Sequence, residues 1–154
     1  MNNSTFEAEL AEKGRLVYAN KGTSMRPLIR QDKDLMVIEK PQGRLKRYDG
    51  ALYIRKDGAY VLHRVLRVKK EGYVICGDNC VKREYGITDK DIIGVLTGVI
   101  RNGKELKASS FRYRLYVHLW CDFIFIRIPI TRIIRFSERV ISKIRRTIRP
   151  EKKK

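Results

Sequence analysis

Short apolar runs separated by turn residues fill the chain between residues 15 and 107. The runs are rich in Val, Ile, Leu and Tyr, a composition typical of strands. Asp57-Gly58 and Asn102-Gly103 each stand between two runs, which predicts tight hairpins there. The segment 78–91 lacks such a run and is expected to be a polar loop. We therefore predict six or seven short strands in residues 15–21, 34–40, 51–56, 59–68, 73–77, 92–100 and 104–106.

Helical periodicity is confined to the two ends of the chain. Residues 4–13 predict a short helix that ends at Gly14. After Ser109 the apolar period changes, and Pro129 would break one long helix, so two helices are expected, the first apolar and aromatic, the second basic and amphipathic. The fold class is thus mainly β: a compact antiparallel domain with a C-terminal helical tail. Its expected parts are a helical segment 1–13, a β domain 14–108 and a basic extension 109–154.

Charge adds a preference for polyanions. The 154 residues carry a formal net charge of +18, and 111–154 alone holds thirteen Lys and Arg against three carboxylates. Such a balance favours nucleic acid or anionic lipid without choosing between them. Residues 111–149 could meet an anionic membrane surface, or the first helix could pack on the β domain and leave a solvated basic face. Nucleic acid is less favoured, since aromatic residues at helical spacing are more often core: Phe111, Tyr113, Tyr116 and Trp120.

Other classes of function lack their signatures. The N-terminal sixteen residues have neither a basic start nor an apolar centre, so no secretory signal is expected. The most apolar run, 115–130, is interrupted by charges and Pro, and a membrane-spanning helix needs about 20 predominantly apolar residues. Three cysteines, an odd number, fit a reducing compartment. We expect a cytoplasmic protein, at most peripheral at the membrane surface. No metal or cofactor is expected, because Cys76 and Cys80 have no second pair and no phosphate-binding glycine loop is present.

The stretch "KGTSMRPLI" places Ser24 in a Gly/Pro-flanked turn between two expected strands. Serine is common in such turns, and a hydroxyl becomes a nucleophile only beside a base. His63, in the middle of "VLHRVL", offers one, because imidazole has a reference pKa of about 6.5 and is largely neutral at pH 7. Taken alone, His63 fits better as a histidine at the edge of the core that hydrogen-bonds a backbone carbonyl. Asp78 and Glu84 are both candidates for a third group that orients the imidazole, and each could instead be an ordinary turn or surface acid.

Taken in order, "G-T-S-M-R-P", "HRV" and "GDN" resemble the catalytic boxes of the signal peptidase I and LexA-type superfamily of serine peptidases. The resemblance covers about residues 14–108. The bacterial branch uses a Lys base, whereas the endoplasmic-reticulum and archaeal branch uses a His, which "HRV" matches. The resemblance implies that Ser24 is the nucleophile and His63 the base. It places the acid at Asp78 or six residues later at Glu84, where the family has Asp.

The resemblance also assigns the loop around the nucleophile. Met25 and Pro27 belong to the S-M-x-P box, and the backbone N–H of Ser24 would meet the oxyanion. Gly22 stands where bacterial signal peptidases often have a second Ser, so the oxyanion site would be backbone-only or helped by Thr23. The implied substrate is an extended leader or signal-type peptide bound along a sheet edge. The alternative is a catalytically silent binding module on the same fold, recruited by its basic tail to a membrane, nucleic acid or protein partner.

Overall fold

The sheet is preceded by a short helix. A computed structural model describes residues 6–123, 127–130, 132–133, 136–137 and 140–141. Helix α1 spans Phe6–Lys13 and buries Leu10, in agreement with the expected N-terminal helix, whose first two residues lie outside the described part. Gly14 ends the helix: its N–H donates to the Leu10 carbonyl at 3.0 Å, and its φ of +67° suits glycine.

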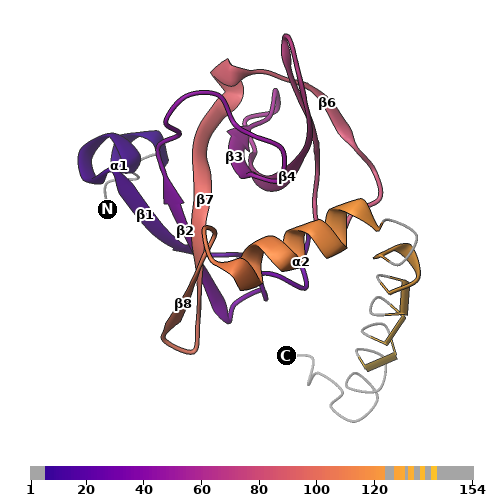
Figure 1. Ribbon diagram of the computed structural model, residues 1–154. Helices are drawn as coiled ribbons and strands as arrows, with labels where there is room; N and C mark the ends of the chain where they lie inside the picture. Colours follow the sequence, from indigo (N-terminus) through magenta and orange to yellow (C-terminus); the bar gives the residue numbers. More distant parts are fainter. Residues whose placement is uncertain (1–5, 124–126, 131, 134–135, 138–139, 142–154) are drawn as a thin grey trace, which may run out of the picture.

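The described part of the chain contains one antiparallel sheet of eight strands (Figure 1). The order across the sheet is β1-β2-β7-β3-β4-β5-β6, and β8 pairs with β7. The mainly β fold class is therefore confirmed. The strands span Arg15–Ala19 (β1), Asp34–Glu39 (β2), Gly50–Ile54 (β3), Tyr60–Lys69 (β4), Gly72–Cys76 (β5), Glu84–Ile87 (β6), Ile92–Arg101 (β7) and Lys104–Lys107 (β8).

Both hairpins predicted from Asx-Gly pairs form. Gly58 connects β3 to β4, with a φ of +80° and an N–H donating to the Arg55 carbonyl at 2.9 Å. Asn102 and Gly103 connect β7 to β8 with φ values of 50° and 75°. Positive φ at both central residues is the geometry that makes Asn-Gly a hairpin turn.

The expected loop 78–91 was wrong over its second half. Strand β6 and a 3-10 turn, η1 at Asp89–Asp91, occupy that half. Strand β6 pairs with β5 through Ile75 opposite Glu84 and Tyr73 opposite Ile87. It is only four residues long and lies at the edge of the sheet, so it needs no buried apolar run, and the apolar pattern could not reveal it.

Strand β4 separates two apolar clusters, because its successive side chains point to opposite faces. Leu62 lies in a cluster with residues of the Ser24 loop and of the C-terminal helix: Met25, Leu28, Ile29, Tyr113 and Val117. Val65 lies in the other cluster with Tyr53, Tyr73 and Ile75. Three buried apolar side chains, those of Met25, Leu28 and Ile29, therefore anchor the Ser24 loop in the core.

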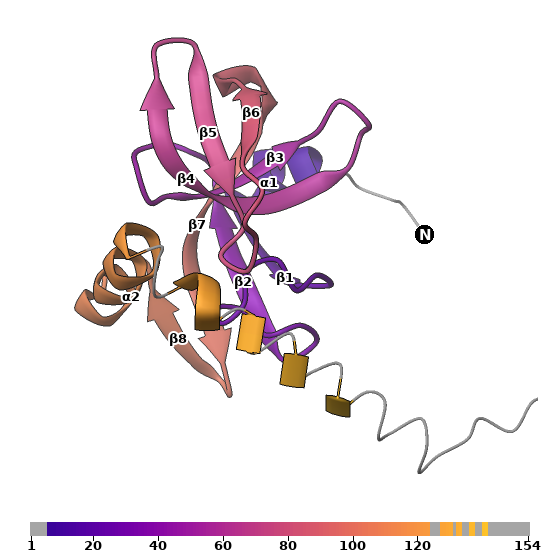
Figure 2. The same ribbon diagram turned by 90° about the vertical axis from the view of Figure 1, so that its right-hand side faces the viewer.

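Helix α2, Phe111–Asp122, crosses one side of the sheet (Figure 1). Its N-cap is Ser110, whose hydroxyl accepts from the Tyr113 N–H. Tyr113 and Val117 on its inner face are buried. The first helix of the C-terminal extension therefore packs on the β domain, which is one of the two arrangements that the sequence left open. The described residues between 127 and 141 are helical and run away from the sheet (Figure 2). The rest of the expected second helix lies outside the described residues. None of the described helices is long and apolar enough to cross a membrane.

A buried carboxylate closes the far end of the Ser24 loop. Asp34 begins β2 with its side chain excluded from solvent, and it accepts from the Arg30 backbone N–H at 2.8 Å. The guanidinium groups of Arg30 and Arg101 each lie 2.8 Å from its oxygens. Burial alone would raise the pKa of Asp34, but these hydrogen bonds outweigh it and hold that pKa well below its ordinary range. Arg101 also donates to the Leu28 carbonyl at 2.9 Å, so the cluster ties the loop to β7.

We expect Asp34→Asn to lower the free energy of unfolding by about 1.5–3 kcal/mol, because charged hydrogen bonds to two arginines are lost. The matched control is Asp32→Asn, an exposed position at positive φ that Asn tolerates, where a change within about 0.5 kcal/mol is expected. Urea unfolding at pH 7 measures both. The stabilisation by the Asp34 carboxylate is complete above the ordinary Asp pKa and is lost as the pH falls through the lowered pKa of Asp34 in the folded protein. The difference in unfolding free energy between Asp34→Asn and wild type should therefore shrink in acid. Equal stability of the two variants would contradict the assignment.

Candidate active site

The Ser24 loop joins β1 to β2 and is fixed at both ends. At its start, the Asn20 side chain donates to the Gly22 carbonyl at 2.5 Å. Next, the Arg26 N–H donates to the Thr23 carbonyl at 3.2 Å, which makes a turn around Ser24. Met25 is buried and Pro27, preceded by a cis peptide bond, is exposed. The S-M-x-P box is thus a turn with its Met as the anchor.

The loop at residues 77–80 holds the Ser24 turn from the opposite side. The Asn79 backbone N–H donates to the Ser24 carbonyl at 2.7 Å, and the Asn79 side chain donates to the Thr23 carbonyl at 3.2 Å. Two motifs separated by fifty residues in the sequence are therefore joined by direct hydrogen bonds. The Asn of "GDN" positions the turn that carries the serine.

His63 lies on the same side as Ser24. The imidazole is buried in the middle of β4. A Cβ added at Gly77 would lie 2.7 Å from the Ser24 carbonyl oxygen and 3.0 Å from His63 Cδ2. Both groups therefore meet at Gly77, which explains why this position has no side chain. The Ser24 carbonyl oxygen and the Cδ2 atom of the ring thus lie close to the same residue.

The other ring nitrogen faces an acid. His63 Nδ1 lies 3.0 Å from Glu84 Oε1 and 3.3 Å from the Tyr53 hydroxyl. An ionised carboxylate only accepts hydrogen bonds, so Nδ1 carries the hydrogen and Nε2 of the neutral ring is free of one. Arg55 grips the same carboxylate with two bonds, Nε to Oε2 at 2.8 Å and a terminal nitrogen to Oε1 at 2.5 Å. Glu84 is thereby held in place for the imidazole.

The electrostatics keep this pair in the neutral His and ionised Glu state. Burial lowers the pKa of His63 below its ordinary value, although the Glu84 charge opposes this. Burial would raise the pKa of Glu84, but hydrogen bonds from Arg55 and Tyr53 outweigh it and lower that pKa. At neutral pH the imidazole is ready to accept a proton, and a carboxylate stands behind it.

Asp78 does not contact the imidazole in the described hydrogen bonds; it pairs with Arg64. Arg64 Nε and a terminal nitrogen lie 2.7 Å from the two Asp78 oxygens, and both side chains are excluded from solvent. Arg64 follows His63 on β4, so the pair links the strand of the imidazole to the loop that holds Ser24. The structure places the Ser24 turn and the His63 ring beside Gly77, puts Glu84 against the imidazole, and gives Asp78 a supporting position on Arg64.

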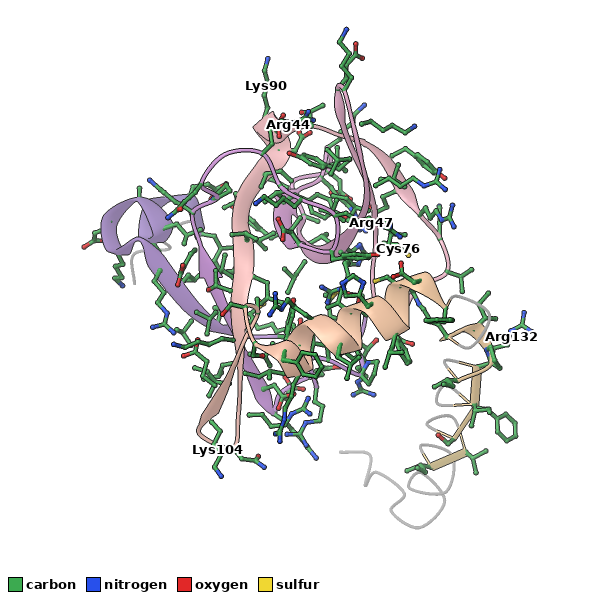
Figure 3. All side chains as sticks on the ribbon, viewed as in Figure 1. Arg44, Arg47, Cys76, Lys90, Lys104 and Arg132 are labelled. Atoms are coloured by element: carbon green, nitrogen blue, oxygen red, sulfur yellow. The ribbon has the colours of Figure 1, made fainter. Side chains whose placement is uncertain are left out.

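Residues from the C-terminal segment complete this support, and sequence reasoning did not find them. Tyr116 donates to Asp78 Oδ2 at 3.0 Å, and the Trp120 indole donates to the Asp78 carbonyl at 2.7 Å. Arg127 donates to the Gly77 carbonyl at 2.5 Å and also to that of Cys80. Figure 3 shows Cys76, at the start of this loop, beside the C-terminal half of α2. The spacing of Tyr113, Tyr116 and Trp120 marks one helical face, but only the fold shows what that face meets.

The turn offers few groups that could bind an oxyanion. Among the hydrogen bonds described for this loop, none has the Ser24 backbone N–H as its donor. Gly22 is committed to the Asn20 turn, where its N–H faces the Asn20 side-chain oxygen at 3.4 Å. Thr23 is exposed, and its carbonyl is used by Arg26 and Asn79. This arrangement is compatible with an oxyanion hole formed by the backbone N–H of Ser24.

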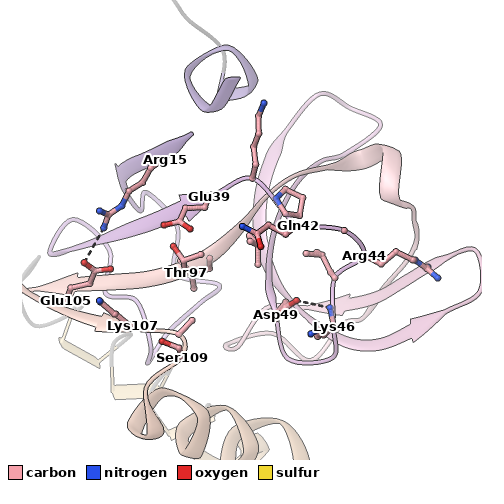
Figure 4. A pocket seen from close by; sticks show the side chains of 17 residues that line it. Arg15, Glu39, Gln42, Arg44, Lys46, Asp49, Thr97, Glu105, Lys107 and Ser109 are labelled. Carbon is pink, nitrogen blue, oxygen red and sulfur yellow. Dashed lines mark hydrogen bonds and ion pairs between the residues drawn. The ribbon is translucent and has the colours of Figure 1, made fainter. Parts of the chain in front are cut away.

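The largest described cavity is elsewhere. It measures about 740 Å³ and lies between the β2–β3 connection and the β7–β8 hairpin (Figure 4). Both positive and negative side chains line it. Arg15 forms an ion pair with Glu105 at 3.2 Å, and the Asp49 carboxylate accepts from the backbone N–H of Lys46 at 2.7 Å. None of the residues around Ser24 and His63 lines it. Ser24, His63, Asp78 and Glu84 line none of the cavities described for this structure.

Within the described residues, no cluster of three or more His, Cys, Asp or Glu side chains could hold a metal ion. No protein-family model, curated protein or solved structure matches this chain. The function is therefore inferred from the residues and the geometry of the site.

We expect Asp78→Asn to destabilise the fold by about 3–5 kcal/mol, because Arg64 would keep a buried charge without a charged partner. Glu84→Gln is the matched carboxylate-to-amide control, and it should cost less, since its partner Arg55 is partly exposed and can be hydrated. Chemical denaturation of the two variants gives the comparison. An Asp78→Asn protein as stable as wild type would contradict the structural role of this acid.

Proposed function

We propose that the protein is a serine endopeptidase that resembles the His-base branch of the signal peptidase I and LexA-type superfamily. Ser24 is the nucleophile, His63 the general base, and Glu84 the acid that orients the imidazole. The observation that carries the proposal is the meeting of the Ser24 turn and the His63 ring at Gly77, with Glu84 on the far nitrogen. A histidine needed only for packing would not require a carboxylate held by a separate arginine.

The chemistry follows from these positions. Nε2 of His63 accepts the Ser24 hydroxyl proton as the oxygen attacks the scissile carbonyl, and the Ser24 N–H stabilises the oxyanion. The imidazolium is stabilised by Glu84 and then protonates the leaving amine. Water, activated by the same imidazole, attacks the acyl-enzyme and releases Ser24. Asp78 acts at a distance, because it fixes the loop whose Asn79 holds the serine turn.

The proposed substrate is an extended leader or signal-type peptide with small residues before the cut, as the family resemblance implies. Binding as an added strand suits a β domain whose site is shallow and not a deep cavity. Within the described residues Cys76, Cys80 and Cys121 form no disulfide, which fits the proposed reducing location in the cytoplasm or at its membrane surface. The competing proposal is a silent binding module on the same fold, and activity measurements separate the two.

We expect Ser24→Ala and His63→Ala each to lower kcat for a small-residue leader peptide by about 10⁴–10⁶. Circular dichroism checks that both variants are folded, which matters most for His63→Ala because the imidazole is buried. Mass spectrometry of the products measures cleavage and locates the cut. Equal cleavage by all three proteins would reject the catalytic assignment, and no cleavage by any of them across a leader-peptide library would favour the binding module.

The pH profile tests the pairing of His63 with Glu84. The base must be deprotonated, so kcat/KM should fall with acid only below the ordinary histidine pKa of about 6.5, because burial lowers the pKa of His63. Glu84→Gln removes a charge that raises this pKa, so the midpoint should move to lower pH while kcat drops by up to about 10⁴-fold. Asp49→Asn, at a half-buried turn where the carboxylate accepts from the Lys46 N–H and makes no described hydrogen bond to the ring, serves as the control. A midpoint that stays in place or rises in Glu84→Gln would remove Glu84 from the site.

A further inference from the structure

Exposed apolar side chains gather on the C-terminal helical segment. Of the fourteen large apolar side chains exposed in the described part of the chain, eight follow the sheet. We call them the tail stripe: Phe111, Leu115, Leu119, Phe123, Ile133, Phe136, Val140 and Ile141. Contiguous exposed apolar surface of this kind marks an interaction site in a folded protein.

The stripe has helical order. Phe111, Leu115 and Leu119 recur every four residues on the outer face of α2 and continue to Phe123, with exposed fractions between 46% and 72%. The inner face of the same helix is already occupied by the sheet and by the Arg64–Asp78 pair. Ile133, Phe136 and Val140 repeat the pattern at spacings of three and four residues on the following helical segment. Packing within the described chain does not cover either outer face.

Basic residues flank these apolar positions. Arg112 and Arg114 are exposed on α2, and Arg132 is exposed on the following segment, where it points away from the sheet (Figure 3). The acid of α2, Asp122, is already engaged by Arg47 at 2.7 Å and by Tyr48. A helix with an apolar stripe and neighbouring arginines is the pattern of segments that lie in the plane of a membrane interface.

We propose that the tail stripe docks on an anionic lipid bilayer, its apolar side chains inserted among the acyl chains and its arginines against the headgroups. The charge selects this occupant. A second copy of the chain would bring another +18 to the same surface, and a nucleic acid would leave the Leu, Ile and Val side chains uncovered. An anionic bilayer satisfies the charges and the apolar residues together.

The experiment uses the full chain carrying Ser24→Ala, so its result stands whether or not Ser24 is a nucleophile. Co-sedimentation is measured with vesicles of phosphatidylcholine mixed with phosphatidylglycerol, and with phosphatidylcholine alone. We expect binding to the anionic vesicles only, weakened by salt. Leu115→Ser with Leu119→Ser should weaken it about tenfold or more, because two inserted side chains are lost.

Two further variants make the result specific. Val17→Ser with Val68→Ser removes two similarly exposed apolar side chains from the sheet and should bind as the parent does. Arg112→Gln with Arg114→Gln should weaken binding about tenfold or more and reduce its salt dependence, because two charges near the headgroups are lost. The fluorescence of Trp120, the single tryptophan, reports whether α2 is packed against the loop at residues 77–80. Before lipid is added, this fluorescence should be the same in all variants.

Three outcomes would overturn the proposal. Unchanged vesicle binding in the Leu115/Leu119 variant would mean adsorption by charge alone. Binding of a random RNA that depends on Arg112 and Arg114 but not on the leucines, without vesicle binding, would assign the surface to nucleic acid. Lipid-independent dimerisation that disappears in the leucine variant would assign it to a second copy of the chain.

Discussion

The buried pair of Arg64 and Asp78 is the interaction on which the candidate site depends. It joins the strand that carries the imidazole to the loop that hydrogen-bonds the serine turn. Taking two charges out of water is costly, and the structure compensates with a two-pronged contact, a hydrogen bond from the Tyr116 hydroxyl to Asp78, and the Tyr113 hydroxyl and Tyr48 carbonyl as acceptors for Arg64. All three side-chain nitrogens of Arg64 and both carboxylate oxygens of Asp78 have hydrogen-bond partners, which favours one relative position of the two segments.

The two acids beside the site have different physical duties because they have different partners. Asp78 faces a guanidinium that is always charged, which fixes it as a support. Glu84 is shared between Arg55 and the imidazole, and this leaves it able to respond when His63 gains a proton. Its extra methylene lets a carboxylate on the edge strand β6 reach a ring in the middle of β4.

Local patterns predicted the sheet well because each strand there carries its own apolar run and each hairpin its own turn residues. Leu62, Val61 and Val65 alternate between two cores as period two requires. Glu84 shows the limit of this reasoning, because its strand lies at the edge of the sheet and has no apolar run. Which of Glu84 and Asp78 contacts the imidazole depends on the arginine that each acid pairs with, and local sequence does not show this. Contacts of Trp120 and Arg127 with residues some fifty positions earlier are likewise set by packing, which no local spacing encodes.

Helix α2 has a consequence for how this chain can be divided. A boundary at residue 108, where the strands end, looks natural from the strand pattern, yet Tyr113, Tyr116 and Trp120 all reach back across it to the Arg64–Asp78 pair. A chain shortened there would keep every strand and still leave two opposite charges and several loop carbonyls facing water where aromatic hydroxyls and an indole had been. A fragment that ends at residue 108 would therefore lack the side chains that stabilise the buried pair beneath the candidate site.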